Sequence, residues 1–318
     1  MDRRSFLRAG ALLALLGTFR KFGFSLQGAE KKQVGKSSSV PDIVALRGTT
    51  PPEMFDRGIR ELGGMGAFVK KGQVVTIKPN IAWDKSPEMA ANTNPDLVAH
   101  VVKECFKAGA SKVLVFDTTC NFWKDTYKNS QIASAASQAG AVVTGGDTAS
   151  DQAYVREYYS EMDVPKGKTL KKAMVHKYVK ECDVFINMPI LKVHGGAKLT
   201  CCMKNLMGIV TKEYHRYFHK NGLNQCIADC CTIRVPDLNI VDAYRVMTKR
   251  GPRGVDKSDV KFLQYQMLGR DMVALDTAGA RLLNVPLRRI GYLPLGEKQG
   301  LGTTKLNTLN IKRINCKS

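Results

Sequence analysis

The pattern of apolar and polar positions along the chain predicts alternating strands and helices. Short apolar or β-branched runs at 73–80, 112–117 and 141–147 predict strands, and longer segments with apolar residues at helical spacing, at 94–110 and 129–141, predict helices between them. The first of these helices starts with an Asn-Pro pair, which is typical of a helix N-terminus. Such alternation is typical of a parallel sheet covered by helices on both faces, so we expect a mostly parallel, Rossmann-like α/β fold.

The alternation continues beyond a more polar and aromatic stretch at 149–172, which we interpret as an insertion or an antiparallel excursion. The chain is therefore expected to form a single α/β domain over 42–315, or two closely packed subdomains. Further elements are predicted as strands at 42–48, 183–189, 238–246, 261–268 and 309–314, and as helices at 51–65, 171–182, 224–234 and 271–283.

The N-terminus carries a pattern of protein export. Arg3-Arg4 and the Ser-Phe-Leu-Arg that follows match the twin-arginine motif, and the apolar stretch at 9–19 is shorter than the ~20 residues that span a bilayer. We expect an export signal at 1–29, a linker at 30–41 and no stable membrane span in the mature chain. The expected partner is the twin-arginine translocation machinery and the expected location is periplasmic or otherwise exported; an N-terminal amphipathic helix is the alternative.

The net charge is +21, from 49 Lys and Arg against 28 Asp and Glu. Nucleic acid, anionic membranes and small anionic ligands are the usual partners of a basic protein. Export argues against nucleic acid, and the basic residues are spread along the chain without an arginine-rich arm or a zinc finger. We interpret the charge as a solvated surface that can also attract a small anionic ligand.

Polar side chains stand at the ends of several predicted strands. In a parallel sheet, ligands bind outside the carboxyl ends of the strands. A single Asp or Asn there often caps the next helix, but several in one chain favour a shared ligand site. The strand-end residues are Lys78, Asn80, Asp117, Asn187, Lys192, His194 and Asp242, and Lys204 and Asn205 follow shortly after.

This set of residues suits a carboxylate or phosphate ligand, because ammonium and amide groups donate hydrogen bonds to anions. The expected ligand-binding residues are Lys78, Asn80, Asn187, Lys204 and Asn205. In an enzyme, His194 near its ordinary pKa would be the general acid and base, Lys192 would assist it, and Asp117 or Asp242 would orient the histidine. A binding protein without chemistry would use the same site. Neither a dinucleotide-binding glycine motif nor a P-loop occurs in the sequence.

The cysteines and histidines allow a different interpretation. Five of the nine cysteines fall between residues 201 and 231, and the pairs Cys226/Cys230 and His215/His219 each have the i, i+4 spacing that places two metal ligands on one helix face. Together with Cys201 and Cys202, they could bind a metal or an iron–sulfur cluster, as in a redox or assembly protein. Against this, the sequence has no Cys-x-x-Cys, and buried cysteine often acts as a small apolar residue.

The segments VVTIKPN, INMPILKVHGGAKLTCCMKNLMGIV and RDMVALDTAGARLL, in this order, make the chain resemble domain-of-unknown-function family 362 over about residues 42–315. The resemblance implies no settled activity. Many members of that family carry a ferredoxin-like Cys-x-x-Cys-x-x-Cys segment and are labelled iron–sulfur proteins, and this chain lacks that segment. The resemblance marks as motif positions Lys78, Asn80, Asp117, Asn187, Lys192, His194, Lys204, Asn205, Asp242 and Asp276.

Overall fold

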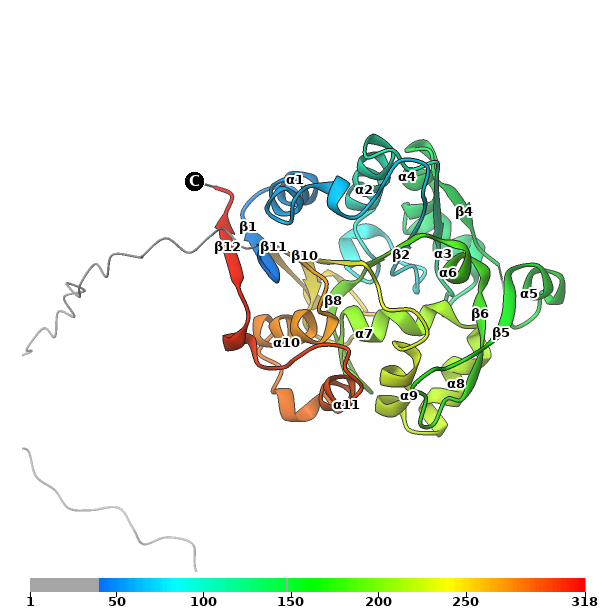
Figure 1. Cartoon of the computed structure of the whole chain (residues 1–318). Coiled ribbons are helices and arrows are strands. Elements are labelled where there is room, and N and C mark those ends of the chain that lie inside the picture. Colours follow the sequence, from blue (N-terminus) through cyan, green and yellow to red (C-terminus); the bar gives the residue numbers. More distant parts are fainter. Residues whose placement is uncertain (1–39, 147, 318) are drawn as a thin grey trace, which may run out of the picture. The chain divides into compact units, whose positions relative to one another are not determined.

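The computed structural model describes residues 40–146 and 148–317, so the expected export signal and nearly all of the linker lie outside the described residues. Within this part of the chain, ten strands form one mixed sheet, shown in Figure 1. Eight of them follow one another across the sheet in the order β12 (Ile311–Asn315), β1 (Ile43–Arg47), β11 (Val260–Gly269), β10 (Leu238–Met247), β7 (Val184–Met188), β2 (Val74–Pro79), β3 (Lys112–Phe116) and β4 (Val142–Thr144).

Most of the sheet is parallel, which confirms the predicted fold class. The run β10, β7, β2, β3 and β4 is parallel throughout, as is the pair β12 and β1. The sequence did not indicate the antiparallel part: β11 runs opposite to both β1 and β10. A hairpin of β8 (Ile190–His194) and β9 (Lys198–Thr200) is attached to β10 through β8.

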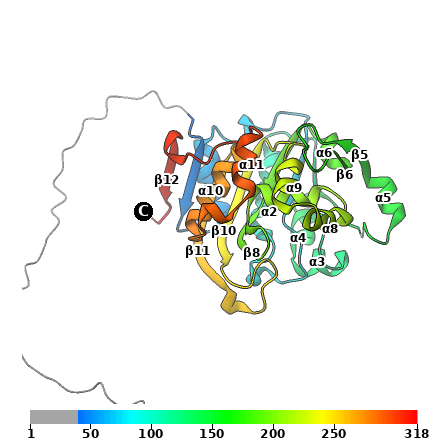
Figure 2. The ribbon, with the colours of Figure 1, turned by 90° about the horizontal axis from the view of Figure 1, so that it is seen from below.

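Helices cover both faces of the sheet. Val113 and Val115 of β3 pack into one apolar core with α1, α2 and α4, whereas Leu114 and Phe116 pack into the other core with α9, α10 and α11. Figure 1 shows the two layers above and below the sheet, and Figure 2 looks onto the lower one. The helices are α1 (Pro51–Glu61), α2 (Pro95–Lys107), α3 (Trp123–Asn129), α4 (Ile132–Gln138), α5 (Gln152–Tyr158), α6 (Lys177–Glu181), α7 (Cys202–Asn205), α8 (Lys212–Lys220), α9 (Leu223–Cys230), α10 (Met272–Leu282) and α11 (Tyr292–Lys298).

Short 3₁₀ turns join several of these elements. The one that matters for the site is η3 (Leu206–Ile209), which continues directly from α7. The others are η1 (Met65–Ala67), η2 (Pro87–Met89), η4 (Lys257–Asp259), η5 (Leu287–Arg289) and η6 (Leu306–Thr308).

Helix α2 begins as its sequence predicts. The Asn94 side chain accepts a hydrogen bond of 3.1 Å from the backbone N–H of Leu97, and Pro95 occupies the first helical position, where its missing N–H costs nothing. The backbone of Gly109 follows the helix with φ of +101°, a left-handed conformation that favours glycine. Local capping therefore sets where this helix begins and ends in the chain segment that connects β2 to β3.

The helix predicted over 171–182 is wrong in its first half. Residues Lys172–His176 form strand β6, which pairs antiparallel with β5 (Tyr159–Asp163) in a separate two-stranded sheet. Only α6 of the predicted helix remains. The alternation of buried Ala173 and Val175 with outward neighbours suits a strand, and β5 supplies the backbone partners that local sequence cannot reveal.

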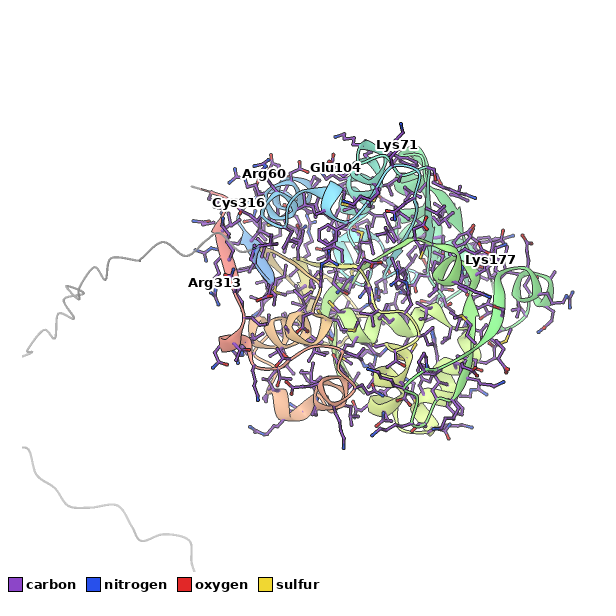
Figure 3. The ribbon with its side chains drawn as sticks, viewed as in Figure 1. Arg60, Lys71, Glu104, Lys177, Arg313 and Cys316 are labelled. Atoms are coloured by element: carbon purple, nitrogen blue, oxygen red, sulfur yellow. The ribbon has the colours of Figure 1, made fainter. Side chains whose placement is uncertain are left out.

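The basic side chains are dispersed over the surface rather than gathered in one tract. Figure 3 labels Arg60, Lys71, Lys177 and Arg313, which come from four separate segments and point outward at different places around the fold. This distribution fits the interpretation of the charge as mostly a solvated surface. Among the described residues, no helix is long and apolar enough to cross a membrane.

Candidate functional site

A half-open cavity of about 220 Å³ lies where the carboxyl ends of β2 and β3 meet the β8–β9 hairpin. Most of the residues expected to bind or react with a ligand line it, although they are spread over more than 140 positions of sequence. The predicted residues that line the cavity are Lys78, Asn80, Asp117, Lys192, His194, Lys204, Asn205, His215 and His219.

The parallel sheet brings the strand-end residues together. β2 lies between β3 and β7, and Lys78 is paired in register with Asn187 of β7. Asp117 follows β3 directly, so its side chain reaches the same edge. The expectation that strand ends share one edge of the sheet therefore agrees with this geometry.

Lys78 and Asp117 form a buried ion pair. The Nζ of Lys78 lies 2.6 Å from Oδ1 of Asp117, and both side chains are almost fully shielded from solvent. The other carboxylate oxygen of Asp117 accepts a 2.6 Å hydrogen bond from the backbone N–H of Ile81. Burial lowers the pKa of Lys78, and the neighbouring carboxylate opposes that effect. Asp117 is thus a partner of Lys78 and not, as the sequence suggested, an orienting group for His194.

Within the part of the chain that the structure describes, Lys192 is buried and forms no ion pair with a carboxylate. Its Nζ donates hydrogen bonds to the backbone oxygen of Ala91 and, over 3.4 Å, to Oδ1 of Asn80. Burial lowers the pKa of Lys192 to about 7, and the nearby Lys204 ammonium adds to this effect. A pKa near neutrality is the property that a proton-transfer group needs at neutral pH. Lys192, expected at the end of the predicted strand 183–189, lies within a further strand, β8, held by β10 on one side and β9 on the other.

Three polar groups around the cavity have no protein partner within residues 40–146 and 148–317. They are Oγ1 of Thr200 and Nε2 of His215, which are buried atoms, and the amine of Lys204, a residue that is only partly buried. Thr200 is 3% exposed, so bulk water does not compensate for its missing partner. Burial lowers the pKa of Lys204. Buried polar groups normally have hydrogen-bond partners, and the two buried atoms and Lys204 line one cavity. A polar ligand in that cavity would supply what they lack.

His194 differs from its expected role as a general acid and base. Its Nδ1 accepts hydrogen bonds of 3.1 Å from the backbone N–H groups of Gly196 and Ala197, so the neutral ring carries its proton on Nε2. Burial lowers the pKa of His194 to about 3, and the Lys204 and Lys192 ammonium groups act in the same direction. At neutral pH this ring offers one N–H donor and no free acceptor, which suits binding an oxygen atom better than removing a proton.

The asparagines form a directed chain of hydrogen bonds. Asn80 donates to Asn205 over 3.0 Å, Asn205 donates to Asn187 over 2.9 Å, and Asn187 donates to Asn239 over 2.9 Å. This order fixes the amide of Asn80 so that its oxygen faces Lys192. Asn187 is fully buried behind the cavity and has no place among the lining residues. Asn187, expected to bind a ligand, therefore supports the chain from behind, whereas Asn205 both lines the cavity and orients Asn80.

Asp242 also lies away from the cavity. Its carboxylate accepts hydrogen bonds from the backbone N–H groups of Asn94, over 2.8 Å, and Tyr244, over 3.0 Å. Burial raises the pKa of Asp242 to about 6. This residue connects β10 to the start of α2 and does not contact His194, the ring that it was expected to orient.

The predicted metal ligands do not come together as a set. Within the described residues, the only groups of three ligand atoms within 4.8 Å of one another are Cys201, Cys202 and Asp276, and a second group at the surface that joins α1 to α2. Cys230 instead donates its thiol hydrogen to the backbone oxygen of Leu206. The surface group consists of Asp56, His100 and Glu104, the last of which is labelled in Figure 3.

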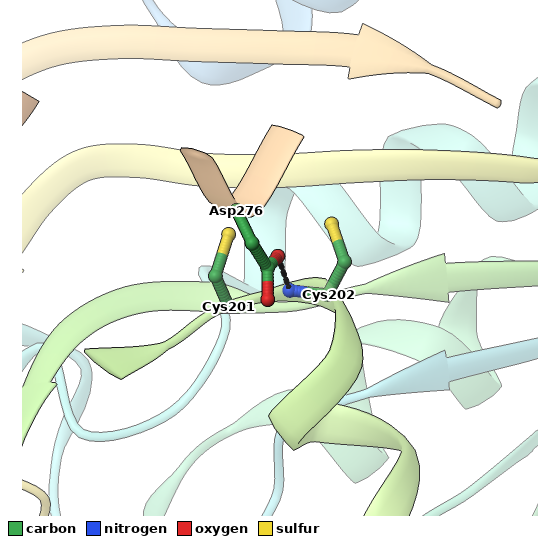
Figure 4. A group of neighbouring side chains, drawn as sticks. All are labelled: Cys201, Cys202 and Asp276. Atoms are coloured by element: carbon green, nitrogen blue, oxygen red, sulfur yellow. Dashed lines mark hydrogen bonds between the residues drawn. The ribbon is translucent and has the colours of Figure 1, made fainter. Parts of the chain in front are cut away.

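Figure 4 shows the buried group of Cys201, Cys202 and Asp276. The Asp276 carboxylate accepts a 2.6 Å hydrogen bond from the backbone N–H of Cys202 and a 3.2 Å hydrogen bond from that of Met203, at the start of α7. Burial raises the pKa of the Cys201 thiol to about 11 and that of the Asp276 carboxyl to about 7. In this arrangement Asp276 satisfies the free amides at the helix start, an ordinary structural role.

Among the cavity residues that sequence reasoning missed are Thr200, Cys120 and Gly208. Thr200 follows an unremarkable Lys-Leu pair, and Cys120 stands alone in a loop, so neither gave a signal. Gly208 was visible within a long apolar run, but its importance lies in the tertiary structure. A Cβ at Gly208 would lie 1.9 Å from Oδ1 of Asp117 and 2.8 Å from Nζ of Lys78, so only glycine leaves room for the ion pair.

Comparison with known proteins agrees with the resemblance found in the sequence. The chain is 26% identical over 255 residues to a thylakoid-associated protein of Synechocystis sp., covering 77% of this chain and 74% of that protein. Among solved structures, the lactate racemase apoprotein from Thermoanaerobacterium thermosaccharolyticum (TM-score 0.47, 13% identity) is matched over 76% of this chain and 57% of its own. A protein from Thermotoga maritima (TM-score 0.44, 10% identity) is matched over 78% of this chain and 59% of its own. The chain thus spans less than two thirds of either solved structure. The model of the family described as "Domain of unknown function (DUF362)" matches residues 75–281, and the chain belongs to this family.

Proposed function

We propose that this protein binds a small carboxylate or phosphate in the cavity and acts on it with Lys192 as the proton-transfer group. The observation that carries the proposal is the Lys204 ammonium, which lines the cavity and has no hydrogen-bond acceptor or carboxylate partner among the described residues. Lys204 is partly buried and burial lowers its pKa, so a negative partner would favour its charged form. An anionic ligand would fill that role.

The balance of charge in the cavity supports an anion. Lys78 and Asp117 neutralise each other, and the histidines at its wall are neutral at pH 7, because burial lowers the pKa values of His194 and His215 to about 3. Burial lowers the pKa values of Lys204 and Lys192 alike, so the protonated fractions of these two lysines leave the cavity positive. The donors of Lys204, Thr200 and His194 would surround a ligand oxygen with hydrogen bonds.

The volume of the cavity limits the size of the ligand. About 220 Å³ is below the ~300–1,000 Å³ of sites for drug-sized molecules, so a compact acid suits the cavity better than a nucleotide. A purely binding protein would need the anion site alone. Lys192 favours an enzyme, because an amine that exchanges its proton near pH 7 can act as both acid and base at that pH.

The binding part of the proposal is tested by calorimetry with phosphate and with small mono- and dicarboxylates. Replacing Lys204 by Met should weaken the binding of an anion about tenfold or more, because a hydrogen bond to a charged group contributes about 1.5–3 kcal/mol. Lys220→Met is the matched control, since it removes the same charge from the exposed end of α8 outside the cavity. Equal loss in both variants, or no binding to the unaltered protein, would contradict the proposal.

We further propose that the protein is exported by the twin-arginine machinery, on the strength of the Arg3-Arg4 motif. Fractionation of cells that express the full chain, beside a variant with Arg3→Lys and Arg4→Lys, provides the test. Export of the first and retention of the second are expected. Equal distribution of both would refute the assignment.

A second candidate function is metal binding at Cys201, Cys202 and Asp276, whose ligand atoms lie within 4.8 Å of one another. Two thiolates and one carboxylate suit zinc or iron, although closed structural zinc sites have four protein ligands. Elemental analysis of protein purified without oxygen, beside Cys201→Ser, tests this function. About one metal ion per chain in the unaltered protein, lost in the variant, would support it, and metal-free protein with alkylatable cysteines would exclude it.

A further inference from the structure

Lys192 and Thr200 face each other across the β8–β9 hairpin. The two residues are paired in register, and antiparallel neighbours of this kind carry their side chains on the same face of the sheet, with Cβ atoms about 4.5–5.5 Å apart. Both residues line the cavity. A buried amine and a buried hydroxyl that lacks a partner among the described residues thus lie side by side.

The surroundings of Lys192 match a neutral amine. Two oxygen atoms accept hydrogen bonds from the Lys192 nitrogen: the Ala91 carbonyl and the Asn80 amide oxygen. An uncharged amine has two N–H bonds, so these two acceptors use both of them, and neither acceptor carries a charge. The chain of asparagines holds the Asn80 oxygen in this orientation. The nitrogen lone pair then remains free of hydrogen bonding to the protein. A lysine that is desolvated beside other cations is a nucleophile toward carbonyl groups.

We propose that Lys192 forms an imine with the carbonyl carbon of a small oxo acid, whose carboxylate is held by Lys204. This inference rests on the proposed anion site and names its substrate class. The carboxylate would satisfy the Lys204 ammonium, and the hydroxyl of Thr200 would donate a hydrogen bond to the carbonyl oxygen. An acid without a ketone or aldehyde group would bind to Lys204 through its carboxylate but would not react with Lys192.

The covalent step balances without a further reactant. The lone pair of the Lys192 nitrogen attacks the carbonyl carbon, a C–N bond forms, and the electrons of the C=O π bond move to the oxygen. One amine hydrogen passes to that oxygen and gives a carbinolamine. The hydroxyl then leaves with the second amine hydrogen as water, and a C=N bond remains. Nothing is oxidised or reduced.

The test uses pyruvate and cyanoborohydride with the full chain. Reduction of an imine adds to one lysine the mass of pyruvic acid less one oxygen atom, and peptide mapping by mass spectrometry should locate the adduct at Lys192. Propionate, which has the same carbon skeleton and carboxylate but no carbonyl, should bind without leaving an adduct. Lys192→Met should lose the adduct, whereas Lys103→Met, at an exposed position on α2, should keep it.

Thr200→Val separates a positioning role from a purely structural one. Val has nearly the shape of Thr and lacks its hydroxyl, so at saturating pyruvate the variant should form the adduct at least several-fold more slowly than the unaltered protein, a rate that weaker binding alone would not change. Binding of pyruvate without any adduct at Lys192, or adducts spread equally over exposed lysines, would overturn the imine and leave the anion site intact. Failure of both acids to bind would overturn the anion site, and the imine with it.

Discussion

The burial of Lys192 predicts a specific dependence of stability on pH. Burial lowers its pKa from 10.5 to about 7, whereas the unfolded chain keeps the ordinary value. Below about pH 7 Lys192 is protonated in both the folded and the unfolded state, so the folded state carries the full free-energy cost of a buried charge. Between about pH 7 and 10 only the unfolded state binds the proton, so the free energy of unfolding rises with pH by about 1.4 kcal/mol per pH unit. Over the whole interval this amounts to about 5 kcal/mol.

Replacing Lys192 by Met keeps a flexible side chain of similar length and removes the titrating amine. Denaturant unfolding followed by tryptophan fluorescence, at about pH 7, 8 and 9, should show the unaltered protein gaining about 3 kcal/mol more than the variant over this range. Lys103→Met on the exposed face of α2 serves as control and should follow the unaltered protein. Parallel stability curves for the unaltered protein and Lys192→Met would refute the claim that Lys192 loses its proton on folding.

Two further predictions concern the surroundings of the cavity. Gly208→Ala should lower the free energy of unfolding by about 1–3 kcal/mol, because the new Cβ would collide with the Lys78–Asp117 pair; Gly66→Ala, where a Cβ meets nothing within 4 Å, should change it far less in the same denaturant assay. Burial raises the pKa of Asp276 to about 7, so between about pH 4 and 7 the folded state holds a proton that the unfolded state has lost, and stability falls as pH rises. Asp276→Asn should flatten this fall in urea unfolding at about pH 5, 6 and 7, and an unchanged slope would show that the carboxyl titrates normally.

The general layout of sheet and cavity could be predicted because it depends on local pattern and on one rule of topology. Apolar runs gave β2, β3 and β7, and the rule that parallel strands end at one edge placed Lys78 and Asp117 together. The buried ion pair between these two side chains could not be predicted. The ion pair needs two side chains 39 positions apart to meet without solvent, and a sequence pattern carries no information on burial of that kind.

The errors share a physical cause. Residues 172–176, predicted as part of a helix, form a strand because the distant segment β5 supplies their hydrogen-bond partners, and residues 190–194 form a strand, not predicted, that pairs with β10. In the same way, the helical spacing of Cys226 and Cys230 was read correctly as one face of α9, but that face is buried in the core. Spacing within an element shows which residues share a face, and only the tertiary structure shows what that face meets.

The position of Lys192 on a strand also explains why this lysine can have unusual chemistry. A lysine on a loop extends into water and keeps its ordinary pKa, since its chain is long and flexible. On β8, between β10 and β9, the backbone of Lys192 is held from both sides, and its side chain lies beneath the cavity at 1% exposure. The same pairing sets Thr200 opposite Lys192, so the hairpin that buries the amine also places the hydroxyl beside it. Loosening the hairpin should therefore raise the pKa of Lys192 and abolish imine formation together, whereas removing the Thr200 hydroxyl should slow the imine and leave the pKa of Lys192 low.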